Sequence, residues 1–240
     1  MTKYDFWEPW RAKTLIEKKA IKSILKARKL IINSIPNKTL VSIYIKGSFV
    51  RRDMNKSSDV DIVPIVTKNK YEKSIFKIND YNLFPACVVP LSISELKHNK
   101  LFTKGICSPD LRAEPDLFIL NLKEYKLIYG KKLNPKDYPH RKNYQIIKDE
   151  INKIKKGYIP AYKEGIIKFE SLLKEVFWLI EWEQKLKHKK IKHSFKNIKN
   201  SLKDKNHIIH DAYAFRIGKY KSKLEKQKFI DSLNKYLENK

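Results

Sequence analysis

The stretch Lys46–Val63 reads KGSFVRRDMNKSSDVDIV and lies between two runs rich in β-branched residues, LVSIYI (40–45) and VDIVPIV (60–66). Such runs, bounded by turn-forming residues, predict two strands. Side chains two apart in a strand point to the same side, so Asp59 and Asp61 are expected to lie side by side. Two neighbouring carboxylates repel each other unless a cation lies between them, and Mg²⁺ prefers such oxygen ligands. The stretch therefore predicts a metal site at the start of the second strand.

A Gly-Ser pair ends the first of these strands. Gly47 permits close approach of a ligand to the backbone, and the free N–H groups of a following helical turn attract anions. Ser48 adds a hydroxyl donor, and Arg51 offers a planar fork for phosphate oxygens. An ordinary β-turn beside a solvated acid pair is the alternative. The combination with two carboxylates favours a phosphate-binding turn that faces a metal site.

The segments GSFVRRD (47–53) and SDVDI (58–62) resemble the signature of the DNA polymerase β-like nucleotidyltransferase superfamily, G-S-x-A-R-G-D followed by S-D-[IV]-D. Within it, the chain is similar to the minimal and aminoglycoside-type nucleotidyltransferases. That resemblance implies an α+β fold, in which a small mixed-sheet domain like the polymerase β palm precedes a C-terminal helical bundle. Arg52 stands where the family usually has glycine.

The resemblance also implies roles for the matching residues. Gly47, Ser48 and Arg51 would bind the nucleotide, while Asp59 and Asp61 would be catalytic and would ligate Mg²⁺, with two ions expected. The reaction would move an NMP group, with AMP favoured, from a nucleoside triphosphate (NTP) to a hydroxyl-type acceptor and release pyrophosphate. The acceptor stays open between a small molecule, RNA and a protein. A homodimer is one form that relatives adopt.

The family usually has a third carboxylate on the next strand, which we expect at residues 84–91. This segment contains no acid, and alignment places Ala86 or Cys87 at the position. Four acids elsewhere are candidate substitutes: Asp80, Glu95, Asp110 and Glu183. A catalytically silent nucleotide- or RNA-binding protein of the same fold is therefore the alternative function.

Helices are expected on both sides of this region. Apolar residues at steps of three and four in 11–34 predict an amphipathic helix before the first strand. After the third strand, Ser92 or Ser94 can cap a helix that has Glu95 in its first turn. From about residue 116 the pattern is helical almost without interruption.

Glycine, prolines and polar residues break the periodicity in Tyr129–Asn143. This break predicts a nucleotidyltransferase domain over 1–135 and a basic helical bundle over 136–240. In the second domain, a long helix is expected to begin after Pro160 and to carry an apolar stripe from Ile166 onward. Glu183, at the margin of that stripe, could serve as a base toward the acceptor.

Composition limits the class of protein. The 240 residues, 42% of them hydrophobic, are enough for a folded core, and the formal charge is +27. Only seven of the 53 basic residues are arginine, so the charge indicates either nucleic-acid binding or lysine-rich codon usage of an AT-rich genome. No apolar run is long enough to span a membrane, and two cysteines, Cys87 and Cys107, make no secreted disulfide framework. We therefore expect a cytoplasmic protein without a membrane partner.

Overall fold

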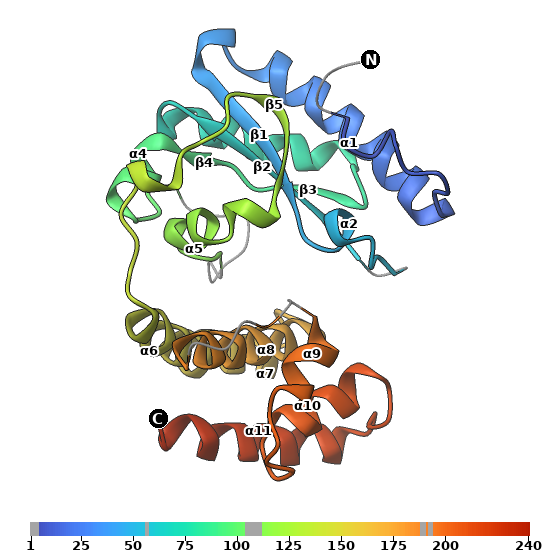
Figure 1. Cartoon of the computed structure of the whole chain (residues 1–240), viewed down its shortest axis with the longest axis vertical. Helices are drawn as coiled ribbons and strands as arrows, with labels where there is room; N and C mark the ends of the chain where they lie inside the picture. Colours follow the sequence, from blue (N-terminus) through green and yellow to red (C-terminus); the bar gives the residue numbers. More distant parts are fainter. Residues whose placement is uncertain (1–4, 56–57, 104–111, 188–190, 192–193) are drawn as a thin grey trace. The chain divides into compact units, whose positions relative to one another are not determined.

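The computed structural model describes residues 5–55, 58–103, 112–187, 191 and 194–240 (Figure 1). The chain divides into two compact units, Met1–His140 and Arg141–Lys240. The first contains the sheet, and the second is helical in its ordered elements. No helix within the described ranges is long and apolar enough to cross a membrane.

The first unit is built on a small mixed sheet, as expected. Its strands are β1 (Leu40–Lys46), β2 (Val60–Val66), β3 (Ala86–Val88), β4 (Leu91–Ser92) and β5 (Lys126–Gly130). The order is β3-β2-β1-β5, and β4 also pairs with β2. Strand β1 runs antiparallel to β2 and β5, whereas β3 and β4 run parallel to β2. The strands predicted at 40–45 and 60–66 are therefore confirmed, and they lie at the centre of the sheet.

Both faces of this sheet are covered. Helix α1 (Leu15–Ser34) begins with a capping box between Thr14 and Glu17. Its buried stripe packs with Ile43, Ile45 and other strand residues in one hydrophobic core. The opposite face contributes Tyr44, Val63 and Ile65 to a second core, which includes residues of two later helices. Burial on both faces fixes the register of the central strands, because a slip of one residue would exchange their two faces.

The remaining helices of this unit are short. They are α2 (Ser48–Arg51), α3 (Glu72–Phe76), α4 (Ile93–His98) and α5 (Pro115–Leu120). The cap predicted for α4 is confirmed, because Ser92 and Glu95 form a capping box.

Two expectations about secondary structure are wrong. The region after residue 116 is not continuously helical, since β5 pairs with β1 from Ser42↔Gly130 to Ile45↔Lys126. The third strand is also split, because β3 ends at Val88 and β4 begins at Leu91 after Pro90. Proline lacks the N–H that a continuous ladder needs.

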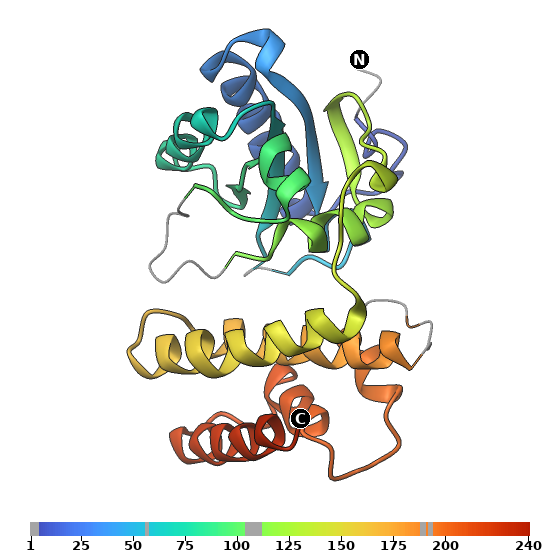
Figure 2. The ribbon, with the colours of Figure 1, turned by 90° about the vertical axis from the view of Figure 1, so that its left-hand side faces the viewer.

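The second unit comprises α6 (Asn143–Lys153), a π-helical segment (Ile154–Tyr158), α7 (Ile159–Lys163), α8 (Phe169–Leu186), α9 (Phe195–Asn200), α10 (Ile209–Arg216) and α11 (Lys223–Glu238). Figures 1 and 2 show α6 alongside α8, which also contacts α10. Aromatic rings gather where α8, α10 and α11 meet, with Phe169, Phe215 and Phe229 in mutual edge contact.

The helix predicted to run from Pro160 through Ile166 is interrupted. Helix α7 ends at Lys163, Gly165 has a φ of +74°, and α8 begins only at Phe169. Ile166 is consequently exposed and does not belong to the buried stripe, which starts at Phe169.

Candidate active site

The turn after β1 has a backbone conformation that requires glycine. Gly47 has φ +88° and ψ −155°, and the helical turn α2 begins at the next residue. A Cβ added at Gly47 would lie 4.0 Å from Asp61 Oδ2, an ordinary contact. The conformation, more than lack of space, therefore selects glycine here. The same measurement shows that the Asp61 carboxylate lies next to the backbone of the turn.

Asp61 lies opposite Lys46 in the antiparallel register of β1 and β2. The Lys46 ammonium group is 3.3 Å from Asp61 Oδ2, and about a third of each side chain is exposed. Asp59 precedes β2 and is exposed, while its carbonyl accepts a hydrogen bond from Ser48 Oγ at 3.5 Å. Ser48 directly follows the Gly47 turn, Asp59 ends the loop and Asp61 is the second residue of β2, so all three lie at the same end of these two strands.

Both carboxylates act on the same ammonium group. Asp61 raises the pKa of Lys46 strongly against the opposing effect of burial, and Asp59 adds a smaller increase. Electrostatic coupling of this kind weakens with distance. Of the two carboxylates, Asp61 is the one that contacts Lys46 directly, and Asp59 lies just before β2.

Tyr125 is a further residue of this region that the sequence prediction missed. It is half-buried directly before β5, and burial raises the pKa of its hydroxyl to about 12. Lys46 and Arg51 oppose that increase and Asp61 adds to it, so Tyr125 lies within electrostatic reach of all three. The phenol stays protonated at neutral pH and can donate a hydrogen bond. The large side chains Tyr125, Leu127 and Tyr129 recur at every second position, and this period is the sequence signal that could have predicted a strand here.

The two arginines of the turn have different surroundings. Arg51 is exposed and pairs with Asp53, with Nε 3.1 Å from Oδ2. Arg52 adopts a left-handed conformation with φ +59°. It binds Glu17 at the start of α1 through Nε at 2.9 Å, and its guanidinium lies 4.5 Å from the Trp10 ring centroid. Arg52 therefore joins the turn to α1.

The strand position beside Asp61 is occupied by Cys87, which is its partner in the parallel register of β2 and β3. Of the two residues that alignment allowed there, the structure thus selects Cys87 over Ala86. Within the described residues, no three His, Cys, Asp or Glu side chains gather closely enough to hold a metal ion by themselves. A third protein ligand for a metal at Asp59 and Asp61 is accordingly not found in this part of the chain.

The candidate substitutes for a third carboxylate have other surroundings. Glu95 is buried and accepts the N–H groups of Ser92 and Phe102. Asp80 is exposed on the 3₁₀ segment Lys77–Tyr81. Glu183 belongs to α8 in the second unit, where Tyr236 donates to it at 2.6 Å. Asp110, like Cys107, lies outside the described residues.

The donor set at Asp59 and Asp61 fits Mg²⁺ that arrives with a nucleotide. Both residues offer hard carboxylate oxygens, and neither side chain is closed off from solvent. Mg²⁺ commonly binds proteins through one or two carboxylates and completes its shell with water and substrate phosphates. Two accessible carboxylates beside an open glycine turn match that pattern better than they match a closed structural metal site.

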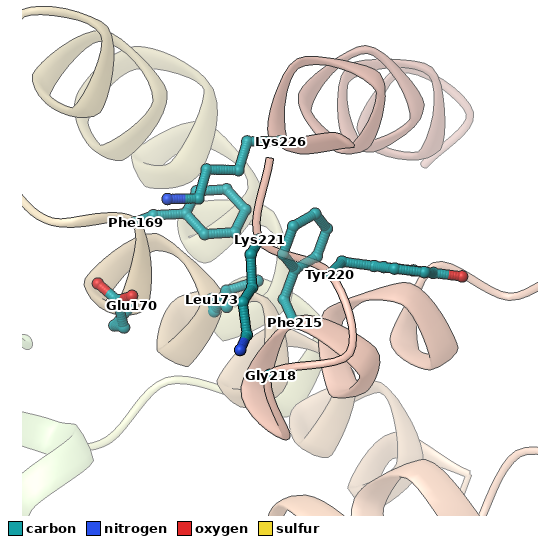
Figure 3. A pocket seen from close by; sticks show the side chains of 8 residues that line it. All are labelled: Phe169, Glu170, Leu173, Phe215, Gly218, Tyr220, Lys221 and Lys226. Carbon is teal, nitrogen blue, oxygen red and sulfur yellow. The ribbon is translucent and has the colours of Figure 1, made fainter. Parts of the chain in front are cut away.

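A separate hollow of about 200 Å³ lies within the second unit (Figure 3). It is lined by Phe169, Glu170, Leu173, Phe215, Gly218, Tyr220, Lys221 and Lys226. The Lys226 ammonium lies 5.2 Å from the centroid of the Phe169 ring. Figure 3 shows these two side chains next to each other. An aromatic floor with two lysines can accommodate a small ligand that has an apolar part and an anionic group.

Comparison with known proteins supports the fold. No family model and none of the curated proteins matches the chain. Among solved structures, it resembles the spectinomycin adenyltransferase of Enterococcus faecialis, which was solved with ATP and spectinomycin. That match has a TM-score of 0.62 at 15% identity and covers 91% of this chain and 99% of that chain. The fold is that of a nucleotidyltransferase with a helical part.

A second match is much weaker. A Sulfolobus solfataricus protein whose name proposes a nucleotidyltransferase aligns over 36% of this chain and 81% of its own, with a TM-score of 0.27 and 18% identity. Such a score carries no weight in assigning the fold or the function.

Proposed function

We propose that the protein is a Mg²⁺-dependent nucleotidyltransferase of the DNA polymerase β-like superfamily. It transfers an NMP group, with AMP favoured, from a nucleoside triphosphate to a hydroxyl-type acceptor. The observation that carries the proposal is the position of the Gly47-Ser48 turn beside two accessible aspartates: Asp61 Oδ2 faces Gly47, and Ser48 Oγ donates to the Asp59 carbonyl. A solved neighbour of the same fold that contains ATP favours ATP as the donor.

The residues of the turn would bind the donor nucleotide. The backbone at Gly47 allows the terminal phosphates to approach closely, and Ser48 can donate its hydroxyl to them. Asp59 and Asp61 would hold Mg²⁺, which neutralises charge on the phosphates and orients the α-phosphate for in-line attack. Arg51 lies at the side of the turn, where its guanidinium can contact phosphate oxygens after leaving Asp53.

The transfer itself has a simple balance. The acceptor oxygen forms a bond to the α-phosphorus, and the bond from that phosphorus to the oxygen bridging toward the β-phosphate breaks. Pyrophosphate leaves, and the acceptor hydroxyl gives up its proton to water.

A small molecule is the first acceptor class to test, because the neighbour of the same fold was solved with spectinomycin. RNA and protein acceptors share the same donor chemistry and are separated only by labelling. The hollow of the second unit, with its lysines and aromatic floor, is one place where an acceptor could contact the helical part.

The decisive experiment is transfer of label from each α-³²P NTP, with Mg²⁺, to a lysate divided into RNA, protein and small-molecule fractions. Label in one fraction identifies both the acceptor class and the nucleotide. The double variant Asp59→Asn/Asp61→Asn should abolish labelling, because it removes both carboxylate charges while keeping side-chain shape. Asp231→Asn, at an exposed position on α11, is the matched control and should label normally. Labelling that persists in the double variant refutes the proposal.

A silent RNA-binding protein of the same fold is the second candidate. It is favoured by the presence of Cys87 beside Asp61 and by the 17 basic against five acidic residues in 185–240. Binding of that kind should weaken steeply as salt is raised and should tolerate Asp59→Asn/Asp61→Asn. RNA binding that is absent or insensitive to salt removes this candidate.

A further inference from the structure

Lys46 forms an ion pair with Asp61, its partner in the antiparallel register of β1 and β2. It is the last residue of β1, directly before the Gly47-Ser48 turn. Its side chain is 32% exposed, and the Asp61 side chain is 31% exposed. The pair is thus tethered at the end of a rigid strand, and its free side opens toward solvent.

The contact between Lys46 and Asp61 competes with metal binding. The Lys46 ammonium approaches Oδ2 of Asp61 to 3.3 Å, and a metal held by Asp61 would bind the same carboxylate group. An ammonium ion and a divalent cation so close to one oxygen repel each other. A metal that binds Asp61 therefore weakens the hold of Asp61 on Lys46.

The position of Lys46 offers it a second partner. A triphosphate bound at the Gly47-Ser48 turn would place several negative charges close to Lys46, because Lys46 directly precedes this turn in the chain. Lysine has a flexible four-carbon stem and three donors, and it binds phosphate as a point charge. Rotation of the side chain can exchange the carboxylate for a phosphate oxygen without any movement of the strand.

We propose, on the basis of the function proposed above, that Lys46 is a positioning residue that neutralises Asp61 until a metal–nucleotide complex arrives and then contacts the triphosphate. In the first state Lys46 holds the Asp61 carboxylate against the turn. In the second it adds a positive charge beside the departing phosphates. Free metal ions are thereby disfavoured relative to metal bound to a nucleotide.

The test measures Mn²⁺ binding by electron paramagnetic resonance, first without nucleotide and then with a non-hydrolysable ATP analogue. Lys46→Met removes the competing charge and keeps the length of the side chain. It should bind Mn²⁺ alone about fivefold more tightly than the unmodified protein, as expected for loss of a partly exposed ion pair. It should bind the Mn²⁺–nucleotide complex about tenfold more weakly, because a charged contact to phosphate is lost.

Two further variants control this test. Lys126→Met removes the same charge from an exposed position on the neighbouring strand β5 and should change neither affinity more than twofold. Lys46→Arg keeps the charge and should retain most of the preference for metal bound to nucleotide. Circular dichroism spectra that match the unmodified protein establish that each variant is folded.

The outcomes separate this inference from the function on which it rests. If the unmodified protein binds Mn²⁺–nucleotide and Lys46→Met shifts neither affinity, or both in the same direction, the inference is overturned and the proposed function stands. Equal shifts in Lys126→Met also overturn it, because they indicate a general effect of net charge. If the unmodified protein binds neither Mn²⁺ nor the complex, the proposed function fails and the inference fails with it.

Discussion

Two lysine–carboxylate pairs in this molecule have similar geometry and opposite surroundings. Lys46 and Asp61 are 3.3 Å apart in the sheet unit, with about a third of each side chain exposed. Lys240 and Glu183 are 3.0 Å apart in the helical unit, where the Glu183 side chain is only 8% exposed. Tyr236 also donates to Glu183 at 2.6 Å, and burial together with Glu183 raises the pKa of this tyrosine strongly.

The difference separates a pair that can exchange partners from a pair that fixes a structure. Asp61 can release Lys46 because solvent, a metal ion or a phosphate can replace each partner. Glu183 cannot easily release its partners, since a buried carboxylate without them would bear a large desolvation cost. Distance alone does not distinguish the two functions, whereas exposure and the number of additional partners do.

Among the substitutions that alter no charge, Gly47→Ala should have the largest effect on activity, and it tests the site that holds the exchangeable Lys46–Asp61 pair. The backbone at Gly47 is one that only glycine adopts readily, so alanine forces the turn to shift. Displacement of bound phosphates by about 1 Å should lower kcat/KM for nucleotidyl transfer by about 100-fold. Steady-state kinetics with the acceptor found by labelling measure the change.

Gly165→Ala is the matched control for this prediction. Gly165 also has a positive φ, +74°, and a Cβ there would meet nothing within 4 Å, but it lies in the helical unit. The substitution should cost about 1 kcal/mol of unfolding free energy and leave nucleotide affinity unchanged. If both alanine variants lose activity equally, strain at Gly47 is not specific to the site.

Glu183→Ala tests the Lys240–Glu183 pair, the one that fixes the structure. Breaking a buried ion pair that a tyrosine also supports should lower the free energy of unfolding by about 2 to 3 kcal/mol, near the lower end for such pairs because Lys240 is partly exposed. Urea unfolding measures the loss. Affinity for the nucleotide should stay within twofold of the unmodified protein.

Glu183→Gln separates this structural role from catalysis. Glutamine keeps an oxygen that can accept from the Tyr236 hydroxyl, so part of the stability should return. If a folded Glu183→Gln protein loses more than tenfold in kcat while KM is unchanged, Glu183 acts as a base toward the acceptor. That result would show that the Lys240–Glu183 pair does not serve only to fix the structure.

Glu72 extends the comparison to a buried carboxylate beside another acid. It is fully buried, and burial together with the nearby Glu95 carboxylate raises its pKa to about 8. Folded protein therefore retains a proton that the unfolded chain releases above its ordinary pKa of 4.5. Stability should fall as pH rises from about 4.5 to about 8, because the unfolded state binds fewer protons in that window.

Glu72→Gln should remove this pH dependence. The variant should unfold with nearly the same free energy at pH 6 as at pH 9, and at pH 9 it should be more stable than the unmodified protein. Urea unfolding across that range measures both slopes. Parallel slopes for the two proteins would show that Glu72 is ionised in the folded state and that its surroundings stabilise the charge.

The sequence predicted the central part of this architecture for physical reasons. Strands β1 and β2 are apolar on both faces, and the Gly-Ser turn and the aspartates lie within 16 residues of chain, so local patterns were enough. The long-range partners were not predictable. Nothing local indicates that Arg52 reaches Glu17, or that Lys46 lies opposite Asp61, because both depend on the register and on how α1 packs.

Short or interrupted elements were missed for a related reason. Strand β5 has only five residues and follows a helical pattern, so the periodic signal before it dominated. Gly165 interrupts an apolar pattern that continues on both sides, and only its positive φ shows that the helix ends. The roles of Gly47, Ser48, Arg51, Asp59 and Asp61 remain predictions to be decided by the measurements above.

Arg52 provides the smallest expected effect, and it tests whether a partly exposed pair can also be structural. Its left-handed backbone favours glycine by about 1 kcal/mol, whereas its hydrogen bonds to Glu17 favour arginine. Arg52→Gly should therefore change the free energy of unfolding by less than about 1 kcal/mol, since the two effects oppose each other. Arg52→Ala loses the bonds and keeps the strain, so it should be about 1 kcal/mol less stable than Arg52→Gly by urea unfolding. Equal stability of the two variants would mean that this position relaxes away from the left-handed region, and a large loss in both would place Arg52 with Glu183 among the pairs that fix the structure.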